Sequence, residues 1–288
     1  MKKLIVNDKF NNKKLSSFFM SSFSDLPRSV FYKLLRKKDI RINDKRISED
    51  ITVYSGDEVL VFLPDIQTHR EFPIAYEDDN ILVIDKPIGI AVTNEDNSLA
   101  DYLKKNYTYI EPCHRLDRNT SGLVIFAKNE EALNILFNCF KHHEIEKHYA
   151  CIVVGSMPKK KDNLNAFLFK DSKKSLVYIS DVKKKGYLPI TTNYQVLAYS
   201  SKHNLSLLDI QIPTGRTHQI RAHLAHIGHP VLGDGKYGIN DINKKFKLKA
   251  QALHAYKIKF NLSKSDLLEY LKGKEIEIPF PKYFNMFD

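Results

Sequence analysis

The chain has 288 residues, of which 43% are hydrophobic and 27% charged, a balance that excludes a disordered chain and is typical of a folded globular protein. Lys and Arg number 45 against 34 Asp and Glu, and the resulting net charge of +11 favours association with a polyanion such as nucleic acid. No apolar run approaches the roughly 18–20 residues of a membrane span, no signal-peptide core follows Met1, and three scattered cysteines favour a reduced cytoplasm.

Residues 1–64 have the pattern of a small basic unit. Apolar residues recur at helical spacing from Leu15 to Phe23, and again from Val30 to Leu35, where basic residues are interleaved with them. The alternating stretch 39–46 then predicts a strand that ends in a tight turn, and 58–63 predicts a closing strand. The segment is therefore expected to combine two helices, the second one basic, with a short sheet.

This order of elements resembles the αL RNA-binding domain first known from a ribosomal small-subunit protein. In that family the second helix and the following loop grip RNA phosphates, and the resemblance implies RNA contacts by four basic residues here: Arg28, Lys33, Arg36 and Lys37. Asp39 and Asp44 stand at turn positions where the family usually has Gly, and Asp tolerates left-handed geometry better than most residues. The alternative is an amphipathic helix whose basic face is merely solvated.

After a linker at 65–74, residues 75–288 are expected to form one α/β domain. Strands are predicted near 81–85, 123–127, 149–154, 175–179 and 205–212, and helices near 98–106, 130–142 and 217–227. Lysine runs at 159–161 and 183–185 lie in polar stretches and predict exposed hairpin tips. The stretch 191–204 gives no functional signal.

The sequence PCHRLDRNTSGL at 112–123 is the most informative motif. It places the carboxylate of Asp117 between Arg115 and Arg118, in a loop that leads into an apolar strand. Loops held at the ends of rigid strands often carry catalytic groups. Taken alone, the motif would be better explained by a structural aspartate in a local ion pair.

Two later motifs bring further polar groups. Residues 146–155, EKHYACIVVG, place Tyr149 at the start of an apolar strand, where a core tyrosine would be the ordinary interpretation. Residues 213–224 read PTGRTHQIRAHL, and the positions of Ile220, Leu224 and Ile227 predict a helix with a mostly buried face. Arg216 comes just before that helix, where its guanidinium could meet a carboxylate.

The three motifs together resemble those of the RluA-type pseudouridine synthases, in the order expected for that family. The resemblance implies an α/β (α+β) catalytic domain with a mixed, largely antiparallel sheet, which isomerises uridine to pseudouridine in structured RNA. Many members carry an acidic residue where this chain has Asn119, a difference that leaves the expected catalytic aspartate intact.

The family's functional residues fall on definite positions of this chain. Asp117 matches the catalytic aspartate, Tyr149 the tyrosine that packs on uracil and is the candidate base for the C5 proton, and Arg216 the basic partner of the aspartate. The resemblance also implies RNA contacts in the catalytic domain, by His114, Arg115, Ile220 and Arg221. Among these, Arg115 matches a position that can fill the space left by a flipped base.

The expected reaction breaks the N1–C1′ bond, turns the uracil and rejoins it through C5, which requires a closed and largely dry site. Asp117 could trap charge at the sugar, abstract a sugar proton or add to the base, and these alternatives stay open. An adjacent Arg216 would favour its ionised form. No metal, nucleotide or redox cofactor is expected. Large-subunit ribosomal RNA is favoured over transfer RNA as substrate, with a cytoplasmic monomer as the expected form.

Two other classes of protein are alternatives to an RNA isomerase. A histidine metal site could draw on His218, His223, His226, His229 and His254, but no acidic residue lies in the helix between the first ones, as zinc enzymes of this type require. A non-catalytic RNA-binding protein would account for the charge and the N-terminal unit. It would not account for Asp117, Tyr149 and Arg216 occurring together.

Overall fold

The computed structural model describes residues 2–23, 26, 28–62, 71–248, 250–263 and 267–287. The chain divides into two compact units, Met1–Glu71 and Phe72–Asp288. Most of the expected linker at 65–74 lies outside the described residues. Within the described ranges, no helix is long and apolar enough to cross a membrane.

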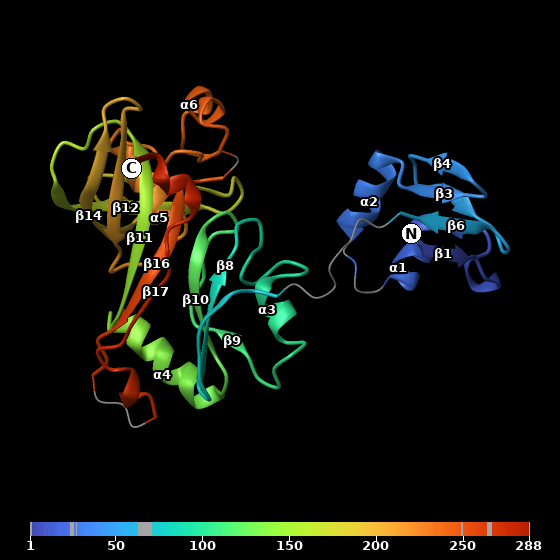
Figure 1. The fold of residues 1–288 in the computed structure, drawn as a ribbon, viewed down its shortest axis with the longest axis horizontal. Helices are drawn as coiled ribbons and strands as arrows, with labels where there is room; N and C mark the ends of the chain where they lie inside the picture. The colour runs from blue at the N-terminus through green and yellow to red at the C-terminus, as the bar shows by residue number, and fades with distance from the viewer. Residues whose placement is uncertain are drawn as a thin grey trace. The chain divides into compact units, whose positions relative to one another are not determined.

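The N-terminal unit packs two helices against a four-stranded antiparallel sheet (Figure 1). The helices are α1 (Leu15–Ser22) and α2 (Arg28–Lys37), preceded by the short 3-10 turn η1 (Asp8–Phe10). The sheet contains, in spatial order, β1 (Lys2–Ile5), β6 (Glu58–Val61), β3 (Ile40–Ile42) and β4 (Lys45–Ile47), while β2 (Lys13–Lys14) pairs with β5 (Thr52–Val53). Phe19, Phe31 and Val61 are fully buried between the layers. Both predicted helices and the strands predicted at 39–46 and 58–63 are confirmed, whereas β1, β2 and β5 were not predicted.

Left-handed residues end α2 and make the turn that follows. Lys38 has a φ of 57° and caps the helix, because the Lys38 and Asp39 amides donate to the carbonyls of Leu35 and Leu34. Asn43 and Asp44 have φ angles of 47° and 65° and form the turn between β3 and β4. The expectation of left-handed geometry is thus met at Asp44, but after α2 it falls on Lys38 rather than on Asp39.

The C-terminal unit is built on one large sheet with strand order β13-β12-β14-β15-β11-β16-β10-β8-β7 (Figure 1). Two short strands lie off this order, β9 paired with β10 and β17 paired with β16. The strands are β7 (Ile74–Glu77), β8 (Ile81–Lys86), β9 (Glu111–Pro112), β10 (Ser121–Ala127), β11 (Ile145–Val154), β12 (Lys161–Asp171), β13 (Leu176–Ser180), β14 (Leu188–Ser200), β15 (Leu205–Gln211), β16 (Leu253–Phe260) and β17 (Glu275–Glu277). Among the described residues of this sheet, β10 and β16 pair in parallel and the other strand pairs are antiparallel, which confirms a mixed, largely antiparallel sheet.

The helices of this unit are α3 (Leu99–Leu103), α4 (Glu130–Lys141), α5 (Gln219–His226) and α6 (Asn240–Lys245), with short 3-10 turns η2 (Glu269–Leu271) and η3 (Lys282–Phe287). Ser98 begins α3 with a reciprocal capping box, in which the Asp101 amide donates to its hydroxyl and its own amide donates to the Asp101 carboxylate. Asn129 caps α4 by accepting from the Ala132 amide at 2.8 Å. The predicted helices therefore exist, although α3 is shorter than expected.

Strand β10 is buried along its whole length and fixes the core on both faces of the sheet. Val124 and Phe126 join the hydrophobic cluster that includes residues of α3 and α5, whereas Leu123 and Ile125 join the cluster under α4. Alternate residues of a strand point to opposite faces, so a continuous apolar run is what a strand covered on both sides needs. This buried strand is the rigid support behind the loop at 113–120.

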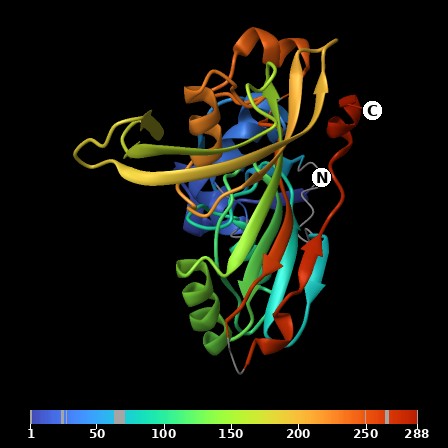
Figure 2. The ribbon, with the colours of Figure 1, turned by 90° about the vertical axis from the view of Figure 1, so that its left-hand side faces the viewer.

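Strands β12 and β14 pair in a long curved arm that extends beyond the rest of the sheet (Figure 2), and β13 pairs with the end of β12. The lysine runs at 159–161 and 183–185 are exposed, as predicted, but neither is the tip of a hairpin. The first leads from β11 into β12 and the second connects β13 to β14, and in neither case do the two flanking strands pair with each other. The sequence did not predict β12, β14 or β16. Polar residues alternate along much of β12 and β14, so neither strand has the apolar run typical of a central strand.

Candidate active site

Asp117 lies in the loop between β9 and β10, and two features of the motif set its position. Leu116, 5% exposed, is buried in the main core cluster and anchors the loop. Gly122 has a φ of 110°, and a Cβ there would lie 2.2 Å from the carbonyl oxygen of Ala255 on β16. Only glycine allows β10 and β16 to approach this closely, and their pairing holds the end of the loop.

A buried lysine holds the other side of the same loop. Lys86, with no exposed surface, ends β8 and donates from Nζ to the carbonyls of Pro87 (3.0 Å), Ile90 (3.0 Å) and Arg118 (3.2 Å). The Gly89 amide also donates to the Arg118 carbonyl at 2.9 Å. The residue directly after Asp117 is therefore tied to the segment that follows β8.

Arg221 forms an ion pair with Asp117. Its Nη1 donates to Asp117 Oδ2 at 2.8 Å, while its Nε and Nη2 donate to the two oxygens of Asp234 at 2.6 and 2.9 Å. Burial opposes the charge of Arg221, but the two carboxylates outweigh it and raise the pKa of the guanidinium. The guanidinium thus has one orientation, fixed from behind by Asp234.

The partner expected for Asp117 was Arg216, and the structure corrects this pairing. Arg216 is exposed and forms no ion pair with any described residue, although it lines the same pocket. The helix was expected to start at Thr217, but α5 starts at Gln219 because His218 has a left-handed φ of 52°. Arg221 is consequently in the first turn of α5 and buried, which directs its guanidinium at Asp117.

Asp234 is itself anchored by the backbone. It has no exposed surface, and its Oδ1 accepts from the amides of Lys236 (2.8 Å) and Tyr237 (3.1 Å). Asn243 of α6 donates to the Asp234 carbonyl at 3.0 Å and accepts from the Gly233 amide at 2.7 Å. Burial would raise the pKa of Asp234, but its bonds to Arg221 prevail and hold it below its ordinary value.

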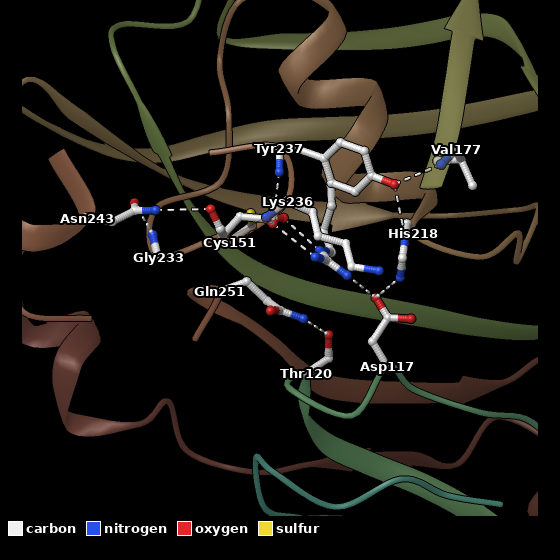
Figure 3. A network of polar contacts seen from close by, with 12 residues as sticks. Asp117, Thr120, Cys151, Val177, His218, Gly233, Lys236, Tyr237, Asn243 and Gln251 are labelled. Atoms are coloured by element: carbon white, nitrogen blue, oxygen red, sulfur yellow. Dashed lines mark hydrogen bonds and ion pairs between the residues drawn. The ribbon is translucent and has the colours of Figure 1, made fainter. Parts of the chain in front are cut away.

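His218 approaches Asp117 from a second direction (Figure 3), with Nε2 4.0 Å from Oδ2. Burial lowers the pKa of His218, with Asp117 opposing the shift, so the neutral ring is favoured. Its Nδ1 lies 2.9 Å from the Tyr237 hydroxyl, which also accepts from the Val177 amide at 2.9 Å. When the Tyr237 hydroxyl donates to Nδ1, the proton of the neutral ring is on Nε2 and faces the Asp117 carboxylate. The other tautomer would place the lone pair of Nε2 against the carboxylate, which is unfavourable.

Asp117 opens into a pocket of about 210 Å³. It is lined by all seven site residues predicted for this unit: His114, Arg115, Asp117, Tyr149, Arg216, Ile220 and Arg221. Tyr149, at 5% exposure, is buried, and desolvation followed by the charge of Asp117 raises its pKa, so its hydroxyl keeps its proton at neutral pH. Residues brought from three separate motifs thus share one cavity.

The individual residues have different environments within that cavity. His114 accepts from the Ile125 amide through Nε2 at 3.1 Å, and burial lowers its pKa to about 3, so it is a neutral structural acceptor. Arg115 is exposed and forms no ion pair with a described residue. Ile220 belongs to the apolar core cluster and presents an apolar wall.

The four basic residues predicted to contact RNA in the N-terminal unit all lie on the exposed side of α2. Phe31, Leu34 and Leu35 form the buried side of this helix. Arg28, Lys33, Arg36 and Lys37 are exposed, and none of them forms an ion pair with a described residue. Their charges are therefore accessible to an anionic ligand.

The five histidines considered for a metal site have separate partners. His223 bonds Thr192 Oγ1, His254 bonds Ser121 Oγ and His226 bonds Asp181. In the part of the chain that the structure describes, no three His, Cys, Asp or Glu side chains are grouped so as to hold a metal ion.

A family model described as RNA pseudouridylate synthase matches residues 80–226, about half of the chain. The chain belongs to the RNA pseudouridylate synthase family. Ribosomal large subunit pseudouridine synthase C of Buchnera aphidicola is 32% identical to it over 98% of this chain and 96% of the relative. The RNA pseudouridine synthase YhcT of Bacillus subtilis is 31% identical over 88% of this chain and 87% of the relative.

Among solved structures, human RNA Pseudouridylate Synthase Domain Containing 1 is similar, with a TM-score of 0.61 and 25% identity over 76% of this chain and 86% of that one. The family and the fold predicted from sequence are confirmed. As a pseudouridine synthase, the protein is an isomerase that converts uridine in RNA to pseudouridine.

Several residues of the site were not singled out from the sequence. Asp234 lies beyond the motif at 213–224, and its part follows only from the burial of Arg221, because a buried arginine requires a buried acid. Lys147 lies two residues before Tyr149 on β11, and that spacing alone would have placed it on the same face of the strand. Tyr237 gave no comparable signal, because its contact with His218 depends on the path of a loop.

Proposed function

We propose that this synthase modifies uridine in large-subunit ribosomal RNA, with Asp117 as its catalytic carboxylate. The observation that carries the proposal is the position of Asp117, which is held against Arg221 at 2.8 Å in a pocket that Tyr149 also lines. The choice of RNA is supported by relatives named for the ribosomal large subunit, such as the Buchnera protein. Transfer RNA is the second candidate substrate.

The chemistry assigned to Asp117 begins at the glycosidic bond. The N1–C1′ bond breaks, the uracil turns within the pocket, the C5–C1′ bond forms, and the C5 proton leaves. A carboxylate can trap the charge at C1′, remove a sugar proton or add to the base, and all three need it ionised and fixed. Arg221 supplies both conditions, because its orientation is set independently by Asp234.

Tyr149 is proposed to pack its ring on the uracil and to receive the C5 proton. Its raised pKa means that the hydroxyl is protonated in the resting site. Accepting the C5 proton therefore requires the hydroxyl to pass its own proton on. The variant Tyr149→Phe separates the two roles, since retained isomerisation would assign the ring alone, and loss of isomerisation with RNA binding intact would assign the hydroxyl.

A buried uridine must be flipped out of the RNA to reach Asp117, which costs on the order of a few kcal/mol. Arg115 is exposed at the edge of the pocket and unpaired among the described residues, so its planar cation is available to fill the vacated space. Ile220 supplies an apolar surface for the base.

The N-terminal unit, residues 1–64, is proposed to bind the same RNA through Arg28, Lys33, Arg36 and Lys37. Residues 65–74 would connect it to the catalytic domain at 75–288. We further infer a cytoplasmic monomer, which is consistent with an RNA substrate and with three free, buried cysteines. Sedimentation of the purified protein would measure the oligomeric state.

The test is tritium release from RNA labelled at uridine C5, comparing the wild type with Asp117→Ala. Transcribed large-subunit ribosomal RNA is the first substrate and bulk transfer RNA the second. Release from ribosomal RNA by the wild type but not by the variant is the expected result. Release from transfer RNA alone would reassign the substrate. Release by Asp117→Ala at the wild-type rate would remove Asp117 from the chemistry.

A further inference from the structure

Lys147 is a cation in the pocket to which the reaction scheme gives no part. It lies on β11 two residues before Tyr149, so both side chains leave the same face of the strand, and both line the pocket. Its ammonium lies 5.0 Å from the ring centroid of Phe140, and a Cβ added to Gly215 would lie 3.5 Å from Nζ. The group is therefore between α4 and the loop that precedes α5.

No counter-charge accompanies this ammonium. Lys147 forms no ion pair and no side-chain hydrogen bond with any described residue, although it is half-buried. Desolvation alone lowers its pKa to about 8, and no carboxylate opposes the shift. A partly buried, unpaired cation is costly, and an anionic ligand would offset that cost.

The charges around the pocket indicate what that ligand is. Asp117 and Asp234 already share Arg221, so they leave a single excess negative charge. Arg115, Lys147 and Arg216 also line the pocket and are unpaired among the described residues, which leaves an excess of two positive charges. A flipped nucleotide carries a uracil without charge and is flanked by two phosphates with one negative charge each.

We propose that Lys147 binds a backbone phosphate that flanks the flipped uridine, and so fixes the depth at which the nucleotide enters the pocket. Arg115 and Arg216 are exposed, whereas Lys147 is half-buried, which makes it the inner of the three free cations. An ammonium is a compact donor that suits a phosphate oxygen. This inference rests on the proposed function, since it presumes an RNA substrate and a flipped uridine.

The first experiment compares kcat and KM of Lys147→Met, Lys147→Arg and the wild type in the tritium-release assay. Loss of one charge-assisted contact is expected to raise KM about 10- to 100-fold while kcat stays nearly unchanged. The salt dependence of log KM should become shallower by about 0.7, the value for one phosphate contact with a single strand. Lys147→Arg should recover most of the affinity. Lys202→Met, which removes a charge from an exposed turn, is the matched control.

The second experiment identifies the partner directly. Once the target uridine is mapped, RNA with a neutral methylphosphonate at either flanking position is assayed with both proteins. One substitution should weaken wild-type binding and leave Lys147→Met unaffected, because the contact is already missing. A methylphosphonate penalty of equal size in both proteins, or a fall in kcat with KM unchanged, would overturn the phosphate assignment. No release by the wild type from any RNA would instead count against the proposed function. Circular dichroism establishes that each variant is folded.

Discussion

Arg221 forms a bidentate ion pair with Asp234, with N–O distances of 2.6 and 2.9 Å. The Asp234 side chain has no exposed surface. The third nitrogen of the same guanidinium, Nη1, donates to Asp117. Asp234 does not line the pocket, so it acts on the reaction through its partners, of which Arg221 contacts Asp117 directly. It is a positioning residue for Asp117, the proposed catalytic carboxylate.

Asp234→Asn should lower kcat about 10- to 100-fold, as the loss of an orienting partner commonly does, with little change in RNA affinity. Breaking a buried ion pair from one side should also reduce the free energy of unfolding by about 3–5 kcal/mol. Tritium release and urea unfolding measure the two effects. Asp241→Asn, in which an exposed pair with Lys244 is lost, should change neither quantity. An unchanged kcat in Asp234→Asn would show that Asp117 does not depend on this pair.

Gly122→Ala should prevent β10 from pairing with β16 in its present register. A methyl group at this position would lie 2.2 Å from the Ala255 carbonyl oxygen, on a backbone with positive φ. We expect the free energy of unfolding to fall by about 3 kcal/mol or more, because the clash is with backbone. Gly235→Ala is the control, since its Cβ would meet nothing within 4 Å. Equal stability of both variants in urea would contradict the close approach.

Tyr237→Phe removes the hydroxyl that joins Val177 to His218. The Val177 amide loses an acceptor, which should cost about 1–2 kcal/mol of stability. His218 loses the group that orients its Nε2 toward Asp117, so kcat should fall while KM is retained. Tyr199→Phe, which deletes an exposed hydroxyl bonded to Asn204, serves as the control for both readouts. Wild-type kcat in Tyr237→Phe would remove His218 from the positioning of the carboxylate.

Acid should destabilise the protein before its carboxylates titrate. Burial lowers the pKa of His114 to about 3 and those of His223 and His254 to about 4. Between pH 6.5 and 5 these residues are protonated in the unfolded chain and neutral in the folded one. The unfolded state then binds more protons, so the free energy of unfolding falls as the pH falls, by up to about 1.4 kcal/mol per pH unit for each histidine.

One histidine has the opposite sign, but it acts in another range. The hydrogen bond and charge of Asp209 raise the pKa of His148, so its contribution is complete below pH 6.5 and is lost as the pH rises above that value. Urea unfolding at pH 6.5, 5.75 and 5.0 therefore measures the combined slope of the histidines whose pKa is lowered by burial, His218 included. His223→Gln should make the slope shallower, and a flat profile in the wild type would contradict the assignment of neutral, buried rings.

The local parts of the site could be predicted from the sequence, because they follow from residues close together in the chain. The apolar run after Asp117 predicts a strand buried on both faces, and β10 has this property. The spacing of Ile220 and Leu224 predicts a buried helical face, and both residues are buried on α5. The family could be recognised for the same reason, since its motifs are short and contiguous.

What could not be predicted depends on tertiary geometry. Arg216 and Arg221 are five residues apart in one motif, and either could have met Asp117. The left-handed His218 between them turns the chain so that only Arg221 is buried. The stretch 191–204 gave no signal because it contributes polar side-chain contacts to residues distant in the sequence. Thr192 on β14 bonds His223 and Gln219 and so supports α5 from the sheet.

Three carbonyl oxygens converge on the ammonium of Lys86, in the way that main-chain oxygens surround a cation in many loops that bind calcium. Here the cation is the side chain of a residue on β8, so it is in place once the strand forms. Unlike a bound metal ion, it cannot dissociate or be removed by a chelator. The loop that bears Asp117 is thus ordered by folding itself, and the synthase meets each new RNA with its carboxylate already in place.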